Sequence, residues 1–289
     1  MVLHRARHTR GNVHRIRAKK SIFKRPWFWL SLLIIAVILT AFYFLLFYPG
    51  FQIKNVLVSG NKKVNTQELQ AIILNNSNTG LVRFWLLNIT SKSIFLLNTD
   101  KLDKEILEKF PAIESLKINK EFPQTITIEI AERKPIGIFC PSADENNCFL
   151  IDQNGIIFEP LTGYSSASPT DFTIVRQTFG NNQVFTGEEV VAQNIINDIA
   201  KIQKNLKDNF QIDLKEALVT SPLRLNVKTS ENWQVYFNLD ASSDINSQIT
   251  KLNLLLSGGI SASDRKNLRY INLIPKDKAE ICDNAVCGG

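Results

Sequence analysis

Four cysteines are the residues of this chain best suited to metal binding, disulfide formation or nucleophilic chemistry. They are Cys140, Cys148, Cys282 and Cys287, and they form two pairs that are close in sequence. In an oxidising compartment we therefore predict the disulfides Cys140–Cys148 and Cys282–Cys287. Binding of zinc by the four thiolates is the alternative interpretation.

The histidines restrict the possible catalytic chemistry. His4, His8 and His14 are the only three, and all lie near the start of the chain. A Ser–His–Asp or Cys–His arrangement in the remainder is therefore excluded. A glycosidase-like pair of carboxylates stays open because acidic residues are scattered throughout. Gly258-Gly259 follows a predicted helix and is typical of a helix stop rather than of a phosphate-binding loop. We predict no catalytic residue, no cofactor and no metal.

The longest apolar segment is residues 27–48, which read WFWLSLLIIAVILTAFYFLLFY and carry no formal charge. A helix needs about 20 apolar residues to cross a bilayer, and aromatic rings favour its two interfaces. A buried core helix and a cleaved signal peptide are the alternatives. The second fits poorly, because Tyr48-Pro49-Gly50-Phe51 is not a small-x-small cleavage site. We predict a permanent transmembrane helix.

The basic residues indicate which way this helix is oriented. Residues 1–26 hold nine of the 34 Lys and Arg residues and no acid, whereas the rest of the chain has 25 basic and 27 acidic residues. The positive-inside rule therefore predicts a cytoplasmic N-terminus. The net charge of +7 belongs to this tail and is no evidence for nucleic-acid binding by the large remainder. The tail either contacts anionic lipid or a cytoplasmic partner, or serves only as a topology signal.

After the anchor, residues 51–132 predict the order strand–helix–helix–strand–strand. Phe51–Val58 alternates as a strand does, Asn65 with Glu68 is typical of a helix start, and Pro111 ends a second helix. Between the helices lies a second apolar run, Leu81–Ile89, which is too short to span a bilayer. We consider it a hairpin inserted over the domain core, a strand paired with Ser93–Leu97, or a loop on the membrane surface.

Residues 133–282 predict a second, strand-rich region. The strands cluster around 136–158, 172–176, 217–239 and 268–282, and Asn154-Gly155 is typical of a tight hairpin turn. Apolar residues at helical spacing predict two helices, over residues 188–207 and 245–256. The fold class is therefore α+β with a mostly antiparallel sheet, whose free edges need a cover or a partner.

The order of these elements and a set of short motifs resemble the FtsQ/DivIB cell-division proteins of bacteria. The resemblance covers roughly residues 20–282, and the ordered set of motifs is more specific than any one of them. The motifs are Phe51-Gln52-Ile53 with Val56, Val58 and Gly60-Asn61; Phe110-Pro111-Ala112-Ile113; Phe122-Pro123 with Ile126 and Ile128; Glu132-Arg133-Lys134-Pro135; Phe149-Leu150-Ile151-Asp152 with Gly155; and Tyr270-Ile271-Asn272-Leu273.

The resemblance implies five segments. They are a basic cytoplasmic tail (1–26), a single transmembrane helix (27–48), a POTRA domain of order β-α-α-β-β (51–132), an FtsQ-type β domain with two helices (133–282) and a C-terminal tail (283–289). It also implies a protein of the bacterial inner membrane at the division septum, with its C-terminal part outside the cytoplasm.

The resemblance further implies a scaffold rather than an enzyme. Such proteins recruit other divisome proteins, notably the bitopic coiled-coil proteins FtsB and FtsL, and FtsB adds a strand beside the last β-strand. Main-chain hydrogen bonds at a free sheet edge give affinity, and flanking side chains give register. In this chain the implied partner-binding residues are Tyr270, Ile274, Lys276, Asp277, Lys278, Ala279, Glu280 and Ile281.

Other interpretations stay open at this point. The last strand is also typical of an edge that lysines guard against pairing. The first strand, Phe51–Val58, is a second candidate edge. As a whole, the chain is alternatively a POTRA-bearing component of protein translocation or assembly, or a membrane-anchored cell-wall enzyme that uses a carboxylate pair. Besides protein partners we expect membrane lipid and no nucleic acid.

Overall fold

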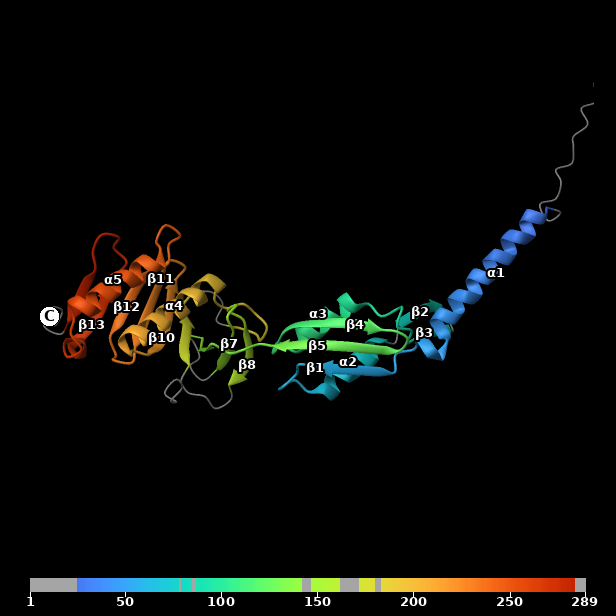
Figure 1. The fold of residues 1–289 in the computed structure, drawn as a ribbon, viewed down its shortest axis with the longest axis horizontal. Coiled ribbons are helices and arrows are strands. Elements are labelled where there is room, and N and C mark those ends of the chain that lie inside the picture. The colour runs from blue at the N-terminus through green and yellow to red at the C-terminus, as the bar shows by residue number, and fades with distance from the viewer. Residues whose placement is uncertain are drawn as a thin grey trace, which may run out of the picture. The chain divides into compact units, whose positions relative to one another are not determined.

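The computed structural model describes residues 25–77, 79–84, 87–141, 147–161, 172–179 and 183–283 (Figure 1). Contacts divide the chain into two compact units. The first contains residues 1–54, 77–97 and 122–124, and the second contains residues 55–76, 98–121 and 125–289. Residues 1–24 of the basic tail and Cys287 lie outside the described residues.

The first unit begins with helix α1, Pro26–Phe47, which is one residue offset from the predicted transmembrane segment. It is long and apolar enough to cross a membrane. Its two polar side chains bond within the helix, because Ser31 Oγ donates to the Phe28 carbonyl and Thr40 Oγ1 to the Ala36 carbonyl. Neither hydroxyl therefore requires a partner in lipid.

The second apolar run folds back on itself. Strands β2, Thr79–Phe84, and β3, Leu87–Ser91, form an antiparallel hairpin in which Phe84 lies opposite Leu87. The run thus forms a hairpin, one of the three alternatives considered, and the alternative of a strand paired with Ser93–Leu97 is wrong, because Ser93 instead makes a bridge with Gln52. Adjacent segments pair at the smallest loop-closure cost, which favours the local hairpin. It belongs to the same unit as α1.

The second unit starts with a three-stranded sheet of order β1-β5-β4. Strand β1 is parallel to β5, and β4 is antiparallel to it. The first strand was predicted to begin at Phe51 but begins at Asn55, because Pro49–Phe51 forms a 3₁₀ turn, η2. The bounds are β1 Asn55–Ser59, α2 Thr66–Ser77, α3 Thr99–Lys109, β4 Ile113–Glu121 and β5 Thr125–Glu132. The predicted order strand–helix–helix–strand–strand is present.

A nine-stranded sheet follows, of order β14-β13-β12-β11-β10-β9-β6-β7-β8. Five of its eight pairings are antiparallel, as predicted. Its strands are β6 Gly137–Phe139, β7 Cys148–Ile151, β8 Ile157–Leu161, β9 Thr173–Gln177, β10 Leu214–Ser221, β11 Arg224–Thr229, β12 Gln234–Asn238, β13 Leu268–Asn272 and β14 Glu280–Asp283.

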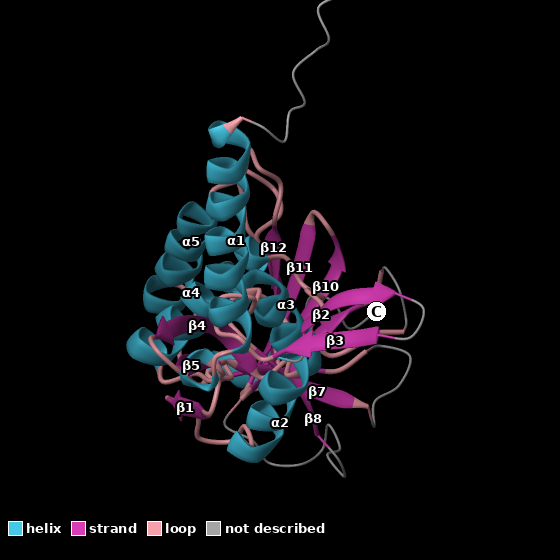
Figure 2. Cartoon of the chain, turned by 90° about the vertical axis from the view of Figure 1, so that its right-hand side faces the viewer, coloured by secondary structure: helices cyan, strands magenta, loops and turns pink. Residues whose placement is uncertain are grey.

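Helices α4, Gln193–Phe210, and α5, Ile245–Gly258, lie side by side and close one core against this sheet (Figure 2). A 3₁₀ turn, η3, Asp264–Asn267, leads into β13. Helix α4 starts later than predicted because residues 188–190 pair with residues 155–157: Ile157 N donates to the Glu188 carbonyl at 3.1 Å, and Val190 N donates to the Gly155 carbonyl at 2.9 Å. Gly155 has φ +76° and a Cβ there would meet the Val191 carbonyl, so this close approach needs glycine. The predicted α+β class is confirmed.

The Glu132-Arg133 pair joins the two sheets of the second unit. One carboxylate oxygen of Glu132 accepts the backbone N–H groups of residues 62, 63 and 64, at 2.6, 2.8 and 3.0 Å. Arg133 Nε donates to the Pro111 carbonyl at 2.9 Å, and its Nη1 donates to Asp152 at 2.5 Å. The motif therefore fixes the end of β5 to the β7–β8 turn.

Candidate partner-binding edge

Strand β14 is one edge of the nine-stranded sheet, and β8 is the other. The two edges differ in their ability to accept another strand. Pro160 in β8 has no N–H to donate, and the neighbouring Glu159 makes an ion pair with Lys63 at 2.8 Å. Strand β14 reads Glu-Ile-Cys-Asp, without proline, and β13 is its one neighbour among the described strands. The terminal strand is therefore the less protected edge.

Ile281 is an apolar residue of β14 that is only partly covered. It lies opposite Ile271 in the β13–β14 register, so the two side chains are on the same face. Ile271 is fully buried, whereas Ile281 is 41% exposed. An additional strand placed beside β14 would cover this apolar side chain as well as the strand's backbone.

Glu280 carries the charge at the start of β14. Lys278 Nζ lies 2.9 Å from one of its carboxylate oxygens, and Asn272 Nδ2 donates to the other at 3.0 Å. The hydrogen bond from Lys278, with that from Asn272 and the lysine charge, lowers the pKa of Glu280 below its usual value. The edge thus presents an ionised carboxylate beside a partly neutralising lysine.

The β13–β14 connection differs from the sequence prediction. Ile274, Lys276, Asp277, Lys278 and Ala279 were expected on an edge strand, but they lie in the loop before β14. The loop is held against α5, because Lys251 Nζ donates to the carbonyls of Pro275, at 3.2 Å, and of Lys276. Carbonyls bound to an ammonium group are not available to a strand ladder. The edge strand is therefore shorter than predicted.

A cavity of about 230 Å³ lies under this loop, at the start of α5. Its wall combines polar and apolar groups, with Ser247 and Lys251 from the helix and Ile274 and Lys276 from the loop. Lys276 Nζ also contacts Ser242 Oγ at 3.3 Å. The charge of Lys276 helps to lower the pKa of Asp240, after two larger contributions from hydrogen bonds with Ser242.

Tyr270 lies one strand inside the edge, on β13. Its ring stacks on Tyr236 of β12 with a centroid distance of 5.1 Å, and Arg224 of β11 lies 4.7 Å from the centroid of that second ring. The row runs across three strands toward β14. Tyr270 was expected from the sequence as a partner-binding residue, whereas Arg224, Tyr236 and Lys251 were not. Strand alternation could have placed the first two on one face, whereas no local pattern marks the lysine.

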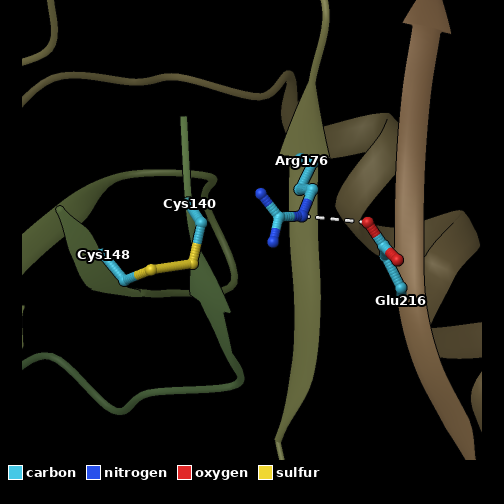
Figure 3. Close-up of a disulfide and its surroundings, with 4 residues drawn as sticks. All are labelled: Cys140, Cys148, Arg176 and Glu216. Atoms are coloured by element: carbon cyan, nitrogen blue, oxygen red, sulfur yellow. Dashed lines mark ion pairs between the residues drawn. A yellow bond between two sulfur atoms is a disulfide. The ribbon is translucent and has the colours of Figure 1, made fainter. Parts of the chain in front are cut away.

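Cys140 and Cys148 form a disulfide with Cα atoms 4.4 Å apart, which closes the loop between β6 and β7 (Figure 3). On the neighbouring β9, Arg176 points toward Glu216 of β10, with 2.9 Å between Nε and a carboxylate oxygen. Cys282 is also disulfide-bonded, but Cys287 lies outside the described residues, so that pairing stays a prediction.

The zinc alternative requires four thiolates, and two of the four sulfurs are already joined to each other. Within the described ranges no group of three or more His, Cys, Asp or Glu residues is placed to hold a metal ion. The three histidines lie outside those ranges.

Part of the chain is similar in sequence to known proteins. Residues 85–133 match the model of the POTRA domain, FtsQ-type. The chain is 32% identical over 111 residues to cell division protein DivIB of Clostridium acetobutylicum, which covers 38% of each chain. It is 29% identical over 106 residues to cell division protein FtsQ of Rickettsia typhi, or 37% of this chain and 34% of that protein. The matched part thus spans little more than a third of these relatives.

Fold and comparison together define the class: an α+β protein with an N-terminal apolar helix that is long enough to cross a membrane, and an FtsQ-type POTRA domain. The matches to residues 85–133 and to proteins named DivIB and FtsQ support the resemblance to the FtsQ/DivIB family that the sequence motifs indicate. Both relatives are named as cell division proteins.

Proposed function

We propose that this chain is a non-catalytic scaffold of the bacterial divisome that recruits other division proteins by strand addition at β14. The observation that carries the proposal is the position of β14 at the end of the nine-stranded sheet, where β13 is its one neighbour among the described strands. A bare strand edge supplies backbone donors and acceptors that a second chain completes.

The side chains at the edge define the partner's chemistry. The partner is an extended segment with an apolar side chain on the core face, where Ile281 is only partly covered. Glu280, Asp283 and the lysines of the preceding loop favour a segment with charges of both signs. The FtsB/FtsL type of bitopic coiled-coil protein is the proposed source of this segment, on the family resemblance. The parallel edge β1, where Leu57 is 55% exposed, is a second candidate.

The proposed topology has the basic tail in the cytoplasm and residues 49–289 outside it. The charge of the tail and the positive-inside rule support this orientation. The Cys140–Cys148 disulfide supports it independently, since disulfides persist in oxidising compartments. The proposed domain limits are those given by the family: POTRA over 51–132 and the β domain over 133–282.

Proline at the edge strand tests the docking mode. We would co-express the full chain with the FtsB-type and FtsL-type proteins of the same bacterium and measure their co-purification from detergent. Ile281→Pro removes one N–H and restricts the backbone of β14. Capture of the partners is expected to be lost, while far-ultraviolet circular dichroism and the melting temperature stay near those of the parent.

The matched control is Glu159→Pro, which places a second proline on the opposite edge β8, where Pro160 already interrupts pairing. This variant is expected to capture both partners normally. Undiminished capture by Ile281→Pro, with the fold intact, would exclude β14 as the docking edge. If Ile281→Pro unfolds, Ile281→Asp provides the same comparison without changing the backbone.

A further inference from the structure

Four aromatic rings form a chain of contacts that starts at the C-terminal end of α1, within the first unit. Tyr48, directly after α1, lies 5.8 Å from Phe51, which lies 5.4 Å from Phe95, which in turn lies 5.2 Å from Phe122, all between ring centroids. These distances are typical of attractive aromatic pairs. We name this set the membrane-proximal aromatic row.

Hydrogen bonds fix the helix end to the segment that carries Phe95. A helix leaves its last carbonyls without partners inside the helix. Here Ser91 Oγ donates to the Leu46 carbonyl at 2.5 Å, and Ser93 Oγ donates to the Leu45 carbonyl at 2.9 Å. The two serines thus tie the exit from β3 to the last turn of α1.

Backbone bonds position the remaining rings. Ile94 N donates to the Phe51 carbonyl at 2.9 Å, and Lys54 N donates to the Gln124 carbonyl at 3.0 Å. The first bond holds Phe51 beside the Phe95 segment, and the second holds the segment of Phe122. All four rings belong to the same compact unit as α1, so the row has a defined place next to the helix end.

The row is largely uncovered. Tyr48, Phe95 and Phe122 are 50%, 44% and 59% exposed. Single exposed apolar residues are ordinary, but a contiguous set of large rings marks an interaction surface. The row is stabilised by its own ring contacts, and Tyr48, Phe95 and Phe122 still leave about half of their surface for another molecule, whereas Phe51 is half-buried.

We propose that this row lies in the interfacial layer of the membrane leaflet at the C-terminal end of α1, so that the chain contacts lipid beyond its transmembrane helix. Two observations select lipid. The row starts at the residue that ends the membrane helix, and aromatic rings favour the headgroup layer. Lys54 and Lys92 are exposed on the same segments, where their ammonium groups suit lipid phosphates.

Quenching of tryptophan fluorescence by brominated lipid tests the proposal. The full chain carries Phe122→Trp as the reporter, with Trp27, Trp29 and Trp85 changed to Phe. Trp233 is retained, because it is fully buried and gives a constant background. The protein is placed at one chain per nanodisc of phosphatidylcholine and phosphatidylglycerol, with or without bromine near the upper acyl carbons. The matched control reporter is Phe185→Trp, at a phenylalanine that is 66% exposed in the second unit.

Bromolipid is expected to reduce the emission of the Phe122→Trp reporter strongly and to leave that of the Phe185→Trp control unchanged. The first reporter should also emit at shorter wavelength than the control. Equal quenching of the two reporters would overturn the proposal and would leave a protein partner or a second chain as the occupant of the row. Phe95→Trp is the second reporter if the first variant does not fold. This result does not depend on which partner binds at β14.

Discussion

Arg133 and Asp152 form a nearly buried ion pair at the junction between the two sheets of the second unit. Arg133 Nη1 lies 2.5 Å from Asp152 Oδ2, and the side chains are 12% and 2% exposed. The other oxygen of Asp152 accepts the N–H groups of Asn154 and Ile156, both at 2.9 Å. One carboxylate therefore shapes the β7–β8 turn and binds the residue that follows β5.

Removal of one partner of this pair is expected to destabilise the protein considerably. Arg133→Met leaves the Asp152 carboxylate buried without its counter-charge, and breaking such pairs costs about 3–5 kcal/mol. Urea unfolding followed by circular dichroism would measure the loss.

The control is Lys63→Met, which removes the exposed Lys63–Glu159 pair, whose side chains are 63% and 38% exposed. Exposed pairs contribute about 0–1 kcal/mol, so this variant should unfold close to the parent. Equal effects of the two substitutions would contradict the role given to Arg133.

Glu132 is expected to make stability depend on pH in the acid range. Desolvation raises its pKa, but the hydrogen bonds from the backbone of Val64, Lys62 and Lys63 outweigh it, so the pKa lies below its ordinary value of 4.5. A carboxyl group with a lowered pKa in the folded state stabilises the fold above its unfolded pKa, and this contribution is lost as pH falls through the folded pKa. Denaturation midpoints measured from pH 7 down to pH 3 should fall less steeply for Glu132→Gln than for the parent. Parallel curves would contradict the assignment.

Local patterns in the sequence were sufficient for part of this fold. Helix α1 follows from an uninterrupted apolar composition, and α3 from Leu102 and Ile106, which recur on one face and are buried as expected. The Asn154-Gly155 turn follows from its residue types. Each of these signals is contained within one element, so no distant contact was needed to interpret it.

Three of the corrections arise from contacts between distant segments. Strand β14 is short because Lys251 binds the carbonyls of Pro275 and Lys276. Helix α4 starts late because residues 188–190 pair with residues 155–157, and Ser93 bridges to Gln52 instead of extending a strand pair. Periodicity does not report such contacts. The open edge at β14 was expected from the family, while the cover of its loop by a lysine was not.

Loss of the Cys140–Cys148 disulfide is expected to cost a moderate amount of stability. The bond closes a short loop, with a sequence separation of 8, and the chain-entropy relation gives about 2.5 kcal/mol for a loop of that length. Cys140→Ser with Cys148→Ser should therefore unfold at lower urea concentration than the parent. The parent treated with a reductant after unfolding provides the comparison, and an unchanged midpoint in the double variant would contradict the estimate.

Lys251 is expected to act on partner binding through the loop before β14. Its Nζ binds the carbonyls of Pro275 and Lys276, which precede β14, so Lys251→Met should free the loop and leave β14 less well ordered for docking. Hydrogen bonds to a charged group contribute about 1.5–3 kcal/mol to the stability of the ordered loop. If this free energy is lost from binding, the dissociation constant is expected to rise roughly tenfold or more. Titration of the purified chain with an FtsB-type segment would measure it. Lys201→Met, on α4, removes a half-exposed lysine paired with Asp198 and should bind as the parent does. The substitution leaves the edge residues in place, and we expect the complex with Lys251→Met to dissociate faster. A dissociation constant equal to that of the Lys201→Met control would show that the loop has no part in docking.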